Sequence, residues 1–221
     1  MAIELSFINI MQFFTLLSQI LISIFLLLQS AVNADMKGIV WMIGSIVSQA
    51  FALGIKQMFF SQDKKKIERN EEPIWQRKLY TLAGTKAGES KIGNYCPSVF
   101  QGPFQHTGIN DTSMPSLVAV FHAFTLTYLI LGLSSNPNPN PGGILFVIIL
   151  LTVAAINLFF RVNLACDIPL DIFAGGIIGI GFGFAWFYLA LVTNPTWTYY
   201  GKEDQKGKCV LGKQKFKCSY D

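Results

Sequence analysis

Charged residues stand where two long apolar runs of this 221-residue chain meet, in the stretch FRVNLACDIPLDIFAGG. Arg161 ends the first run, and Asp167 and Asp171 begin the second, four residues apart and hence on one side of a helix. An arginine beside carboxylates can form strong charge-assisted hydrogen bonds, and a carboxylate can also act as a nucleophile. Ionisable groups at membrane depth are costly, so they usually pair or mark a functional site. The stretch therefore predicts either a structural ion pair or a functional site.

Two further ionisable residues lie inside or at the end of apolar runs, namely Lys56 and His122. Each of the five residues also has a structural explanation. Asp167 precedes an Ile-Pro pair and can cap a helix, while Asp171 would interact favourably with the dipole of that helix. Lys56 and Arg161 can extend to the membrane interface. His122 can be a packing histidine whose hydrogen bonds are satisfied.

The elements that must position these residues are apolar runs long enough to cross a ~30 Å hydrocarbon core. They predict transmembrane helices at about 7–31, 39–60, 116–133, 144–160 and 168–192. The composition, 52% hydrophobic and 14% charged, is that of an integral membrane protein. The runs lack the alternation of barrel strands. We therefore expect an all-α, multi-pass bundle of about five transmembrane helices in one domain, 1–192. Which membrane holds it is left open.

The remaining segments are a long loop, 61–115, and a basic tail, 193–221. The formal net charge of +4 is small and spread over two segments, so no nucleic-acid partner is expected. No Cys/His spacing resembles a zinc site, and GIGFG lacks a preceding strand, so neither a metal nor a dinucleotide cofactor is expected.

Two patterns concern the last apolar run. Gly175, Gly179 and Gly183 recur every four residues, which predicts one helix face that allows close approach of another helix, within or between chains. Aromatic residues gather around the end of the run, where rings favour the headgroup region, and we expect them to be interfacial anchors. They are Trp186, Tyr188, Trp197, Tyr199 and Tyr200.

The cysteines bear on orientation. Cys209 and Cys218 flank an alternating segment of the tail, compatible with a small disulfide-closed hairpin if that side is oxidising. Cys96 and Cys166 lie on the opposite side in a five-span arrangement. Since one compartment cannot oxidise both pairs, the redox state of each pair tests the orientation.

Together, these residues resemble the type-2 phosphatidic-acid phosphatase superfamily, the lipid phosphate phosphatases and their relatives. That family carries the motifs K-x6-R-P, P-S-G-H and S-R-x5-H-x3-D. The third motif resembles Phe160-Arg161, five residues, Asp167, three residues and Asp171, and the second resembles Pro115-Ser116-Leu117-Val118. Of the first motif, Lys56 is in place, with Asp63-Lys64 where Arg-Pro would stand.

The resemblance implies a lipid phosphate phosphatase core with a phosphate cradle, of which Lys56, Ser116 and Arg161 would be the remnant. In the family, the third-motif histidine attacks phosphorus, its aspartate orients that histidine, and the second-motif histidine protonates the leaving alcohol. The two histidine positions are Asp167 and Val118 in this chain, and Asp171 stands at the aspartate position. The family core commonly has six spans, so its first span would be missing.

These departures change the expected chemistry. Valine cannot transfer a proton, and the charges of Lys56 and Arg161 are cancelled by those of Asp167 and Asp171 before any phosphate arrives. We expect Asp167 to occupy the place of the phosphate in an internal ion-pair network. His122, four residues beyond Val118 on the same helix face, is a possible substitute for the missing histidines.

The sequence thus predicts a catalytically inactive phosphatase-like protein that acts as a structural or lipid-contacting subunit of a membrane assembly. Its expected partners are membrane lipids and other subunits of that assembly. One alternative is a divergent lipid-phosphate hydrolase or phosphotransferase, a phosphoric monoester hydrolase that would use Asp167 or His122. A weaker alternative is a lipid carrier or flippase-like protein.

Overall fold

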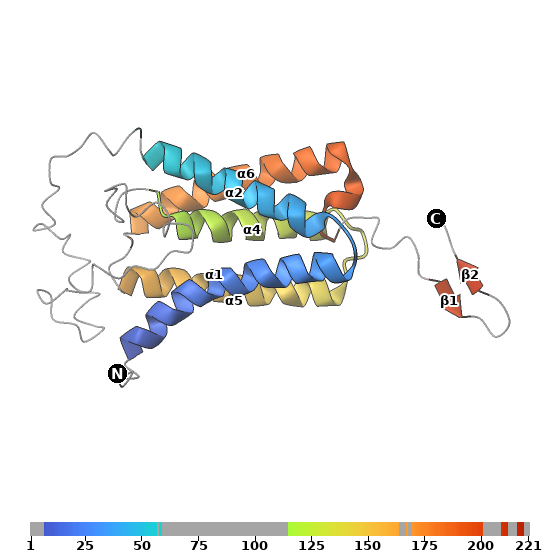
Figure 1. Cartoon of the computed structure of the whole chain (residues 1–221), viewed down its shortest axis with the longest axis horizontal. Coiled ribbons are helices and arrows are strands. Elements are labelled where there is room, and N and C mark those ends of the chain that lie inside the picture. The colour runs from blue at the N-terminus through green and yellow to red at the C-terminus, as the bar shows by residue number, and fades with distance from the viewer. Residues whose placement is uncertain are drawn as a thin grey trace, which may run out of the picture.

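The chain folds as a bundle of long α-helices that run side by side (Figure 1). The computed structural model describes residues 7–56, 58, 115–163, 167, 169–200, 209–211 and 216–218. Within these residues the helices are α1 (Phe7–Val32), α2 (Lys37–Ile55), α4 (Leu117–Ser134), α5 (Pro141–Asn163) and α6 (Pro169–Thr193), followed by the 3-10 helix η4 (Pro195–Trp197). The prediction of an all-α, multi-pass membrane bundle is confirmed. Most of the predicted 61–115 loop, including Cys96, lies outside the described residues, as does Cys166.

Four of these helices, α2, α4, α5 and α6, are each long and apolar enough to cross a membrane. Helix α1 spans 26 residues and includes the apolar segment Leu17–Val32. The largest difference from the expected bounds at a helix start concerns α5, which begins at Pro141 rather than near 144. Asn140 Oδ1 accepts a hydrogen bond from the Gly142 amide at 3.1 Å, and proline suits a first helical turn because it lacks an N–H. The α-helical part of α2 ends at Ile55, while residues 57, 59 and 60 of the predicted span lie outside the described residues.

Helix α4 lies at the centre of the bundle, in contact with α2, α5 and α6, while α1 packs on α2 and α5. The core between them is largely aromatic, with Trp41, Phe121, Phe124, Tyr128 and Phe187 almost fully buried. Large apolar side chains on the outer faces are exposed instead, among them Leu145 on α5 and Phe173 on α6. Apolar side chains on the outer faces as well as in the core suit a lipid environment, in which outward apolar groups carry no penalty.

The glycine repeat of α6 faces α4 within the same chain. A Cβ added to Gly175 would lie 2.5 Å from the Ser116 carbonyl oxygen, and one added to Gly179 would lie 2.5 Å from the Val120 carbonyl oxygen. At Gly183 the nearest atom would be Thr127 Cβ at 2.8 Å. The helices approach too closely for any side chain at these positions, which explains the four-residue spacing.

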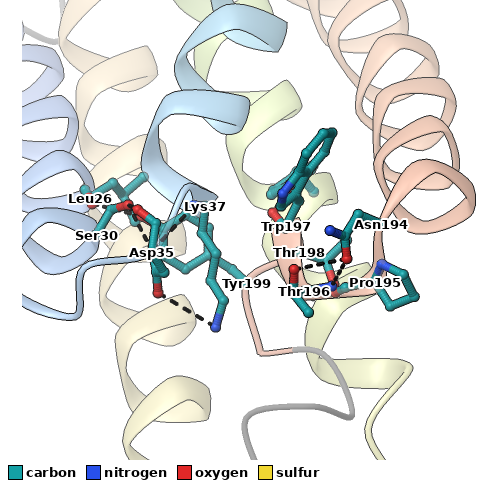
Figure 2. Close-up of polar contacts among 11 residues, drawn as sticks. Leu26, Ser30, Asp35, Lys37, Asn194, Pro195, Thr196, Trp197, Thr198 and Tyr199 are labelled. Carbon is teal, nitrogen blue, oxygen red and sulfur yellow. Dashed lines mark hydrogen bonds and ion pairs between the residues drawn. The ribbon is translucent and has the colours of Figure 1, made fainter.

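Residues 194–200, here called the terminal cap, follow α6 and lie beside the turn that joins α1 to α2 (Figure 2). Tyr199 Oη donates to the Leu26 carbonyl at 2.6 Å, and Tyr128 Oη donates to the Trp197 carbonyl at 3.2 Å. Asn136 Nδ2 of the α4–α5 loop donates to the Tyr200 carbonyl at 3.3 Å. The expectation that Tyr199 is a headgroup anchor is wrong, because its side chain is buried against α1.

The turn beneath the terminal cap is ordered by Asp35. Ser30 Oγ donates to Asp35 Oδ1 at 2.7 Å, and the Lys37 amide donates to the same oxygen at 3.2 Å. Lys37 Nζ also lies 3.6 Å from Asp35 Oδ2. Asp35 therefore fixes both the end of α1 and the start of α2.

A small antiparallel hairpin in the tail departs from the helical architecture. Strand β1 (Cys209–Leu211) pairs with β2 (Phe216–Cys218), with Cys209 opposite Cys218 and Leu211 opposite Phe216. In Figure 1 the hairpin is separate from the helices and lies beyond the end of the bundle at which α1 meets α2.

Candidate functional site

The predicted charged residues meet at the end of the bundle opposite the terminal cap, where α4 begins, α5 ends and α6 begins. Backbone hydrogen bonds join the three segments there. The Ser116 amide donates to the Asp171 carbonyl at 3.0 Å, and the Asp167 amide donates to the Arg161 carbonyl at 3.4 Å. The first bond ties the start of α4 to the start of α6, and the second ties Asp167 to the end of α5.

Asp167 is the centre of this cluster. Its Oδ2 accepts hydrogen bonds from Arg161 Nε and, at 2.8 Å, from Ser116 Oγ. The side chains of Arg161 and Asp167 are 3% and 4% exposed. A carboxylate withdrawn from water needs such charge-assisted partners, and one oxygen receives both of them here.

Ser116 uses its hydroxyl in two directions. It is the N-cap of α4, where Oγ accepts a hydrogen bond from the Ala119 amide at 3.4 Å. The same oxygen donates its proton to Asp167. The hydroxyl is thus engaged both by the helix and by the carboxylate, which ties the start of α4 to the ion pair.

Lys56 and Asp171 are buried at the same end of the bundle. Ala52 of α2 packs against Leu117 of α4, and Lys56 lies one turn further along α2. Lys56 follows the C-terminus of α2 and Asp171 stands in the first turn of α6, so each charge has the sign that the adjoining helix dipole favours. With all four groups ionised, the charges of Lys56, Arg161, Asp167 and Asp171 sum to zero.

Val118, which the resemblance would align with the second-motif histidine, is buried in α4. A hydrocarbon side chain offers neither a lone pair nor a labile proton. The position that protonates the leaving group in the resembled family therefore has no acid–base chemistry in this chain.

His122, the possible substitute, belongs to a different polar cluster one turn deeper in α4. Its Nε2 lies 3.0 Å from Asn157 Nδ2 of α5, which also donates to Ser18 Oγ of α1 at 2.5 Å. Nε2 of His122 is therefore engaged by the side-chain amide of Asn157. Through Asn157, His122 therefore links α4 to α5 and α1.

Sequence reasoning missed Asn157 and Ser18. Both are buried polar residues within apolar runs, a pattern that often marks hydrogen bonding between membrane helices. That pattern could have identified them as candidates, although their common partner on α4 follows only from the packing. No group of three His, Cys, Asp or Glu residues is placed to hold a metal ion within the described part of the chain.

Comparison with protein-family models, with curated proteins and with solved structures finds no match for this chain. The resemblance to lipid phosphate phosphatases thus depends only on the motif residues of this chain, above all Ser116, Arg161, Asp167 and Asp171.

Proposed function

We propose that this chain is a catalytically inactive, phosphatase-like membrane protein that acts as a structural or lipid-contacting subunit of a membrane assembly. One observation carries the proposal. Asp167 Oδ2 accepts hydrogen bonds from both Arg161 and Ser116, two residues that would belong to the phosphate cradle. The carboxylate takes the hydrogen-bond donors that a phosphate would need.

Charge supports the same conclusion. A phosphate dianion needs an excess of cations, because unscreened repulsion from a second anion is large in a low-dielectric site. The buried cluster offers two cations and two carboxylates, so it has no such excess. The hydrogen bonds from Arg161 and Ser116 also withdraw electron density from the Asp167 carboxylate, which makes it a weaker nucleophile.

The outer surface supports the lipid-contacting part of the proposal. Exposed Leu, Ile and Phe side chains occur along the outward faces of α5 and α6, among them Leu151, Phe159, Ile177 and Leu189. These faces would contact acyl chains or apolar helices of neighbouring subunits.

The first test is phosphate release from phosphatidic acid by the full chain in lipid nanodiscs, with Arg161→Ala as the matched variant. We expect no release from either protein above that of empty nanodiscs. Release by the wild type that disappears in Arg161→Ala would instead establish the hydrolase alternative and direct attention to Asp167 and His122.

A second test asks whether Asp167 closes the cradle. Asp167→Asn keeps the shape of the side chain but removes its charge, so Arg161 would become available to an anionic headgroup. We expect native mass spectrometry to show more phosphatidic acid retained by Asp167→Asn than by the wild type. Phosphatidylcholine retention should not change.

The matched control for this test is Asp35→Asn/Lys37→Gln, which removes a carboxylate at the opposite end of the bundle together with the lysine that pairs with it, so that no cation is released. It should leave phosphatidic acid retention as in the wild type. Equal retention by folded Asp167→Asn and by the wild type would contradict the proposed closure.

A further inference from the structure

The tail hairpin pairs two of the four cysteines of the chain. Its register sets Cys209 opposite Cys218, Val210 opposite Lys217 and Leu211 opposite Phe216. The two cysteines are the outermost pair, at the open end of the hairpin. They are therefore the positions at which a cross-link would close the whole β1–β2 unit into one ring.

Directly opposed positions suit a disulfide. Paired residues in an antiparallel ladder have Cα atoms about 4.5 or 5.5 Å apart, depending on the hydrogen-bonding pattern. A disulfide bridges Cα atoms roughly 4.4–6.8 Å apart. Both kinds of pair fall in that range, so a bond between Cys209 and Cys218 needs no change of register.

Backbone pairing of two short strands stabilises the hairpin only weakly. An isolated two-stranded hairpin is marginal in water, and each strand here has three residues. A covalent bond between its ends would restrict the unfolded tail and so favour the paired form.

We propose that Cys209 and Cys218 form an intramolecular disulfide and that the end of the bundle carrying the terminal cap faces an oxidising compartment. The bond forms between the two sulfur atoms. Two protons and two electrons pass to the disulfide of an oxidised thiol–disulfide oxidoreductase, which becomes a dithiol. This proposal is independent of the phosphatase resemblance.

Because the hairpin follows the terminal cap in the chain, a disulfide in the hairpin also indicates how the bundle is oriented in the membrane. The tail leaves the bundle after Tyr200, at the end where α1 meets α2. Helix α5 ends, and α1 and α6 begin, at the other end of the bundle (Figure 1). The cluster of Ser116, Arg161 and Asp167 lies there, because Arg161 is in the last turn of α5 and Asp167 precedes α6. Structural disulfides persist only on oxidising sides of membranes, so the charged cluster would face the reducing side.

The test uses the full chain with Cys96→Ser and Cys166→Ser, so that Cys209 and Cys218 are its remaining thiols. Thiols are blocked with N-ethylmaleimide in intact eukaryotic cells before lysis. Trypsin cuts after Lys208, Lys213 and Lys217, which would release the peptides CVLGK and CSYD. We expect mass spectrometry to find these two peptides joined, two hydrogens lighter than their sum and without maleimide.

The side of the membrane is read independently in sealed vesicles from cells of the same type that express a second version of the chain, with one epitope tag at each terminus. Protease added outside, at the cytosolic face, should remove the N-terminal tag and leave the C-terminal tag protected. Two maleimide-modified peptides, or a disulfide that joins two chains, would overturn the proposed bond. Digestion of the C-terminal tag would overturn the proposed orientation.

Discussion

At the scale of single residues, Asp167 decides how the charged end of the bundle works. Its carboxylate joins Arg161 of α5 and Ser116 of α4 at the point where α6 is about to begin. Buried ion pairs contribute little net stability when complete, because desolvation offsets the attraction. They become costly when one partner is removed, which makes the pair accessible to mutational analysis.

Arg161→Ala should lower the free energy of unfolding by about 3–5 kcal/mol, because it leaves the buried Asp167 carboxylate without its cation. The double variant Arg161→Ala/Asp167→Ala should be more stable than the single variant, since it removes the orphaned charge as well. Denaturant unfolding in detergent micelles measures both. A double variant less stable than Arg161→Ala would show that the pair does not carry this energy.

Asn157→Leu should lower the free energy of unfolding by about 1–2 kcal/mol, because it withdraws the amide that bonds both His122 and Ser18. Thr152→Val on the same helix is the matched control, since Thr152 bonds the carbonyl of Ile148 in its own helix and is exposed. We expect the control to unfold as the wild type does. An equal effect of the two substitutions would contradict a link between helices at Asn157.

At the scale of elements, the contact between α4 and α6 dominates the packing. Helix α4 is also the most buried of the four spans, because 61% of its residues are buried inside the bundle. Tight contact needs glycine on α6, because the backbone of α4 occupies the space that side chains would fill. This close contact between α4 and α6, here called the seam, sets the distance between Ser116 and Asp171. It therefore allows the backbone hydrogen bond that joins them.

Gly179→Ala should lower the free energy of unfolding by about 1–3 kcal/mol, because its Cβ would clash with α4 and overpack the seam. Gly181→Ala on the same helix is the matched control, since a Cβ there meets no atom within 4 Å. The control should be neutral or gain up to about 1 kcal/mol from helix propensity. Thermal unfolding in nanodiscs compares the two, and similar losses would show that the seam tolerates a methyl group.

The sequence predicts where the helices lie along the chain better than it predicts which helices pack against one another. Apolar runs identify each helix, and the spacing of Gly175, Gly179 and Gly183 identifies a packing face. Nothing in the linear order shows that α4 is central or that Asn157 meets His122, because those facts depend on three-dimensional packing. Tyr199 illustrates the same limit, since a residue after a span can turn back and become buried.

At the scale of the whole molecule, the terminal cap connects α1, α4 and the α4–α5 loop at one end of the bundle. Tyr199 reaches α1, Trp197 receives the hydroxyl of Tyr128 on α4, and Tyr200 receives an amide from the α4–α5 loop. Burial, and then the nearby Asp35 carboxylate, raise the pKa of Tyr199. The phenol therefore stays neutral and able to donate its proton.

Tyr199→Phe should lower the free energy of unfolding by about 1 kcal/mol at neutral pH, the usual contribution of one hydrogen bond. Its pH dependence gives a second readout. Because the folded-state pKa lies above the unfolded value of about 10, the unfolded chain releases this proton first, and the wild type loses stability as pH rises above that value. Unfolding measured from pH 8 to 11 should show a shallower loss for Tyr199→Phe, whereas parallel curves would contradict the assigned bond.

The central position of α4 has a consequence for how the chain is made. Ser116 is separated from Asp167 by 51 residues, and His122 from Asn157 by 35. At a synthesis rate of about 5–20 residues per second, Asp167 would emerge roughly 3–10 s after Ser116. During that interval α4 must enter the membrane with its histidine and capping serine exposed to lipid, water or the insertion machinery. During biogenesis, the most buried of the four spans therefore passes through a step in which His122 and Ser116 lack the hydrogen-bond partners that they have in the folded chain.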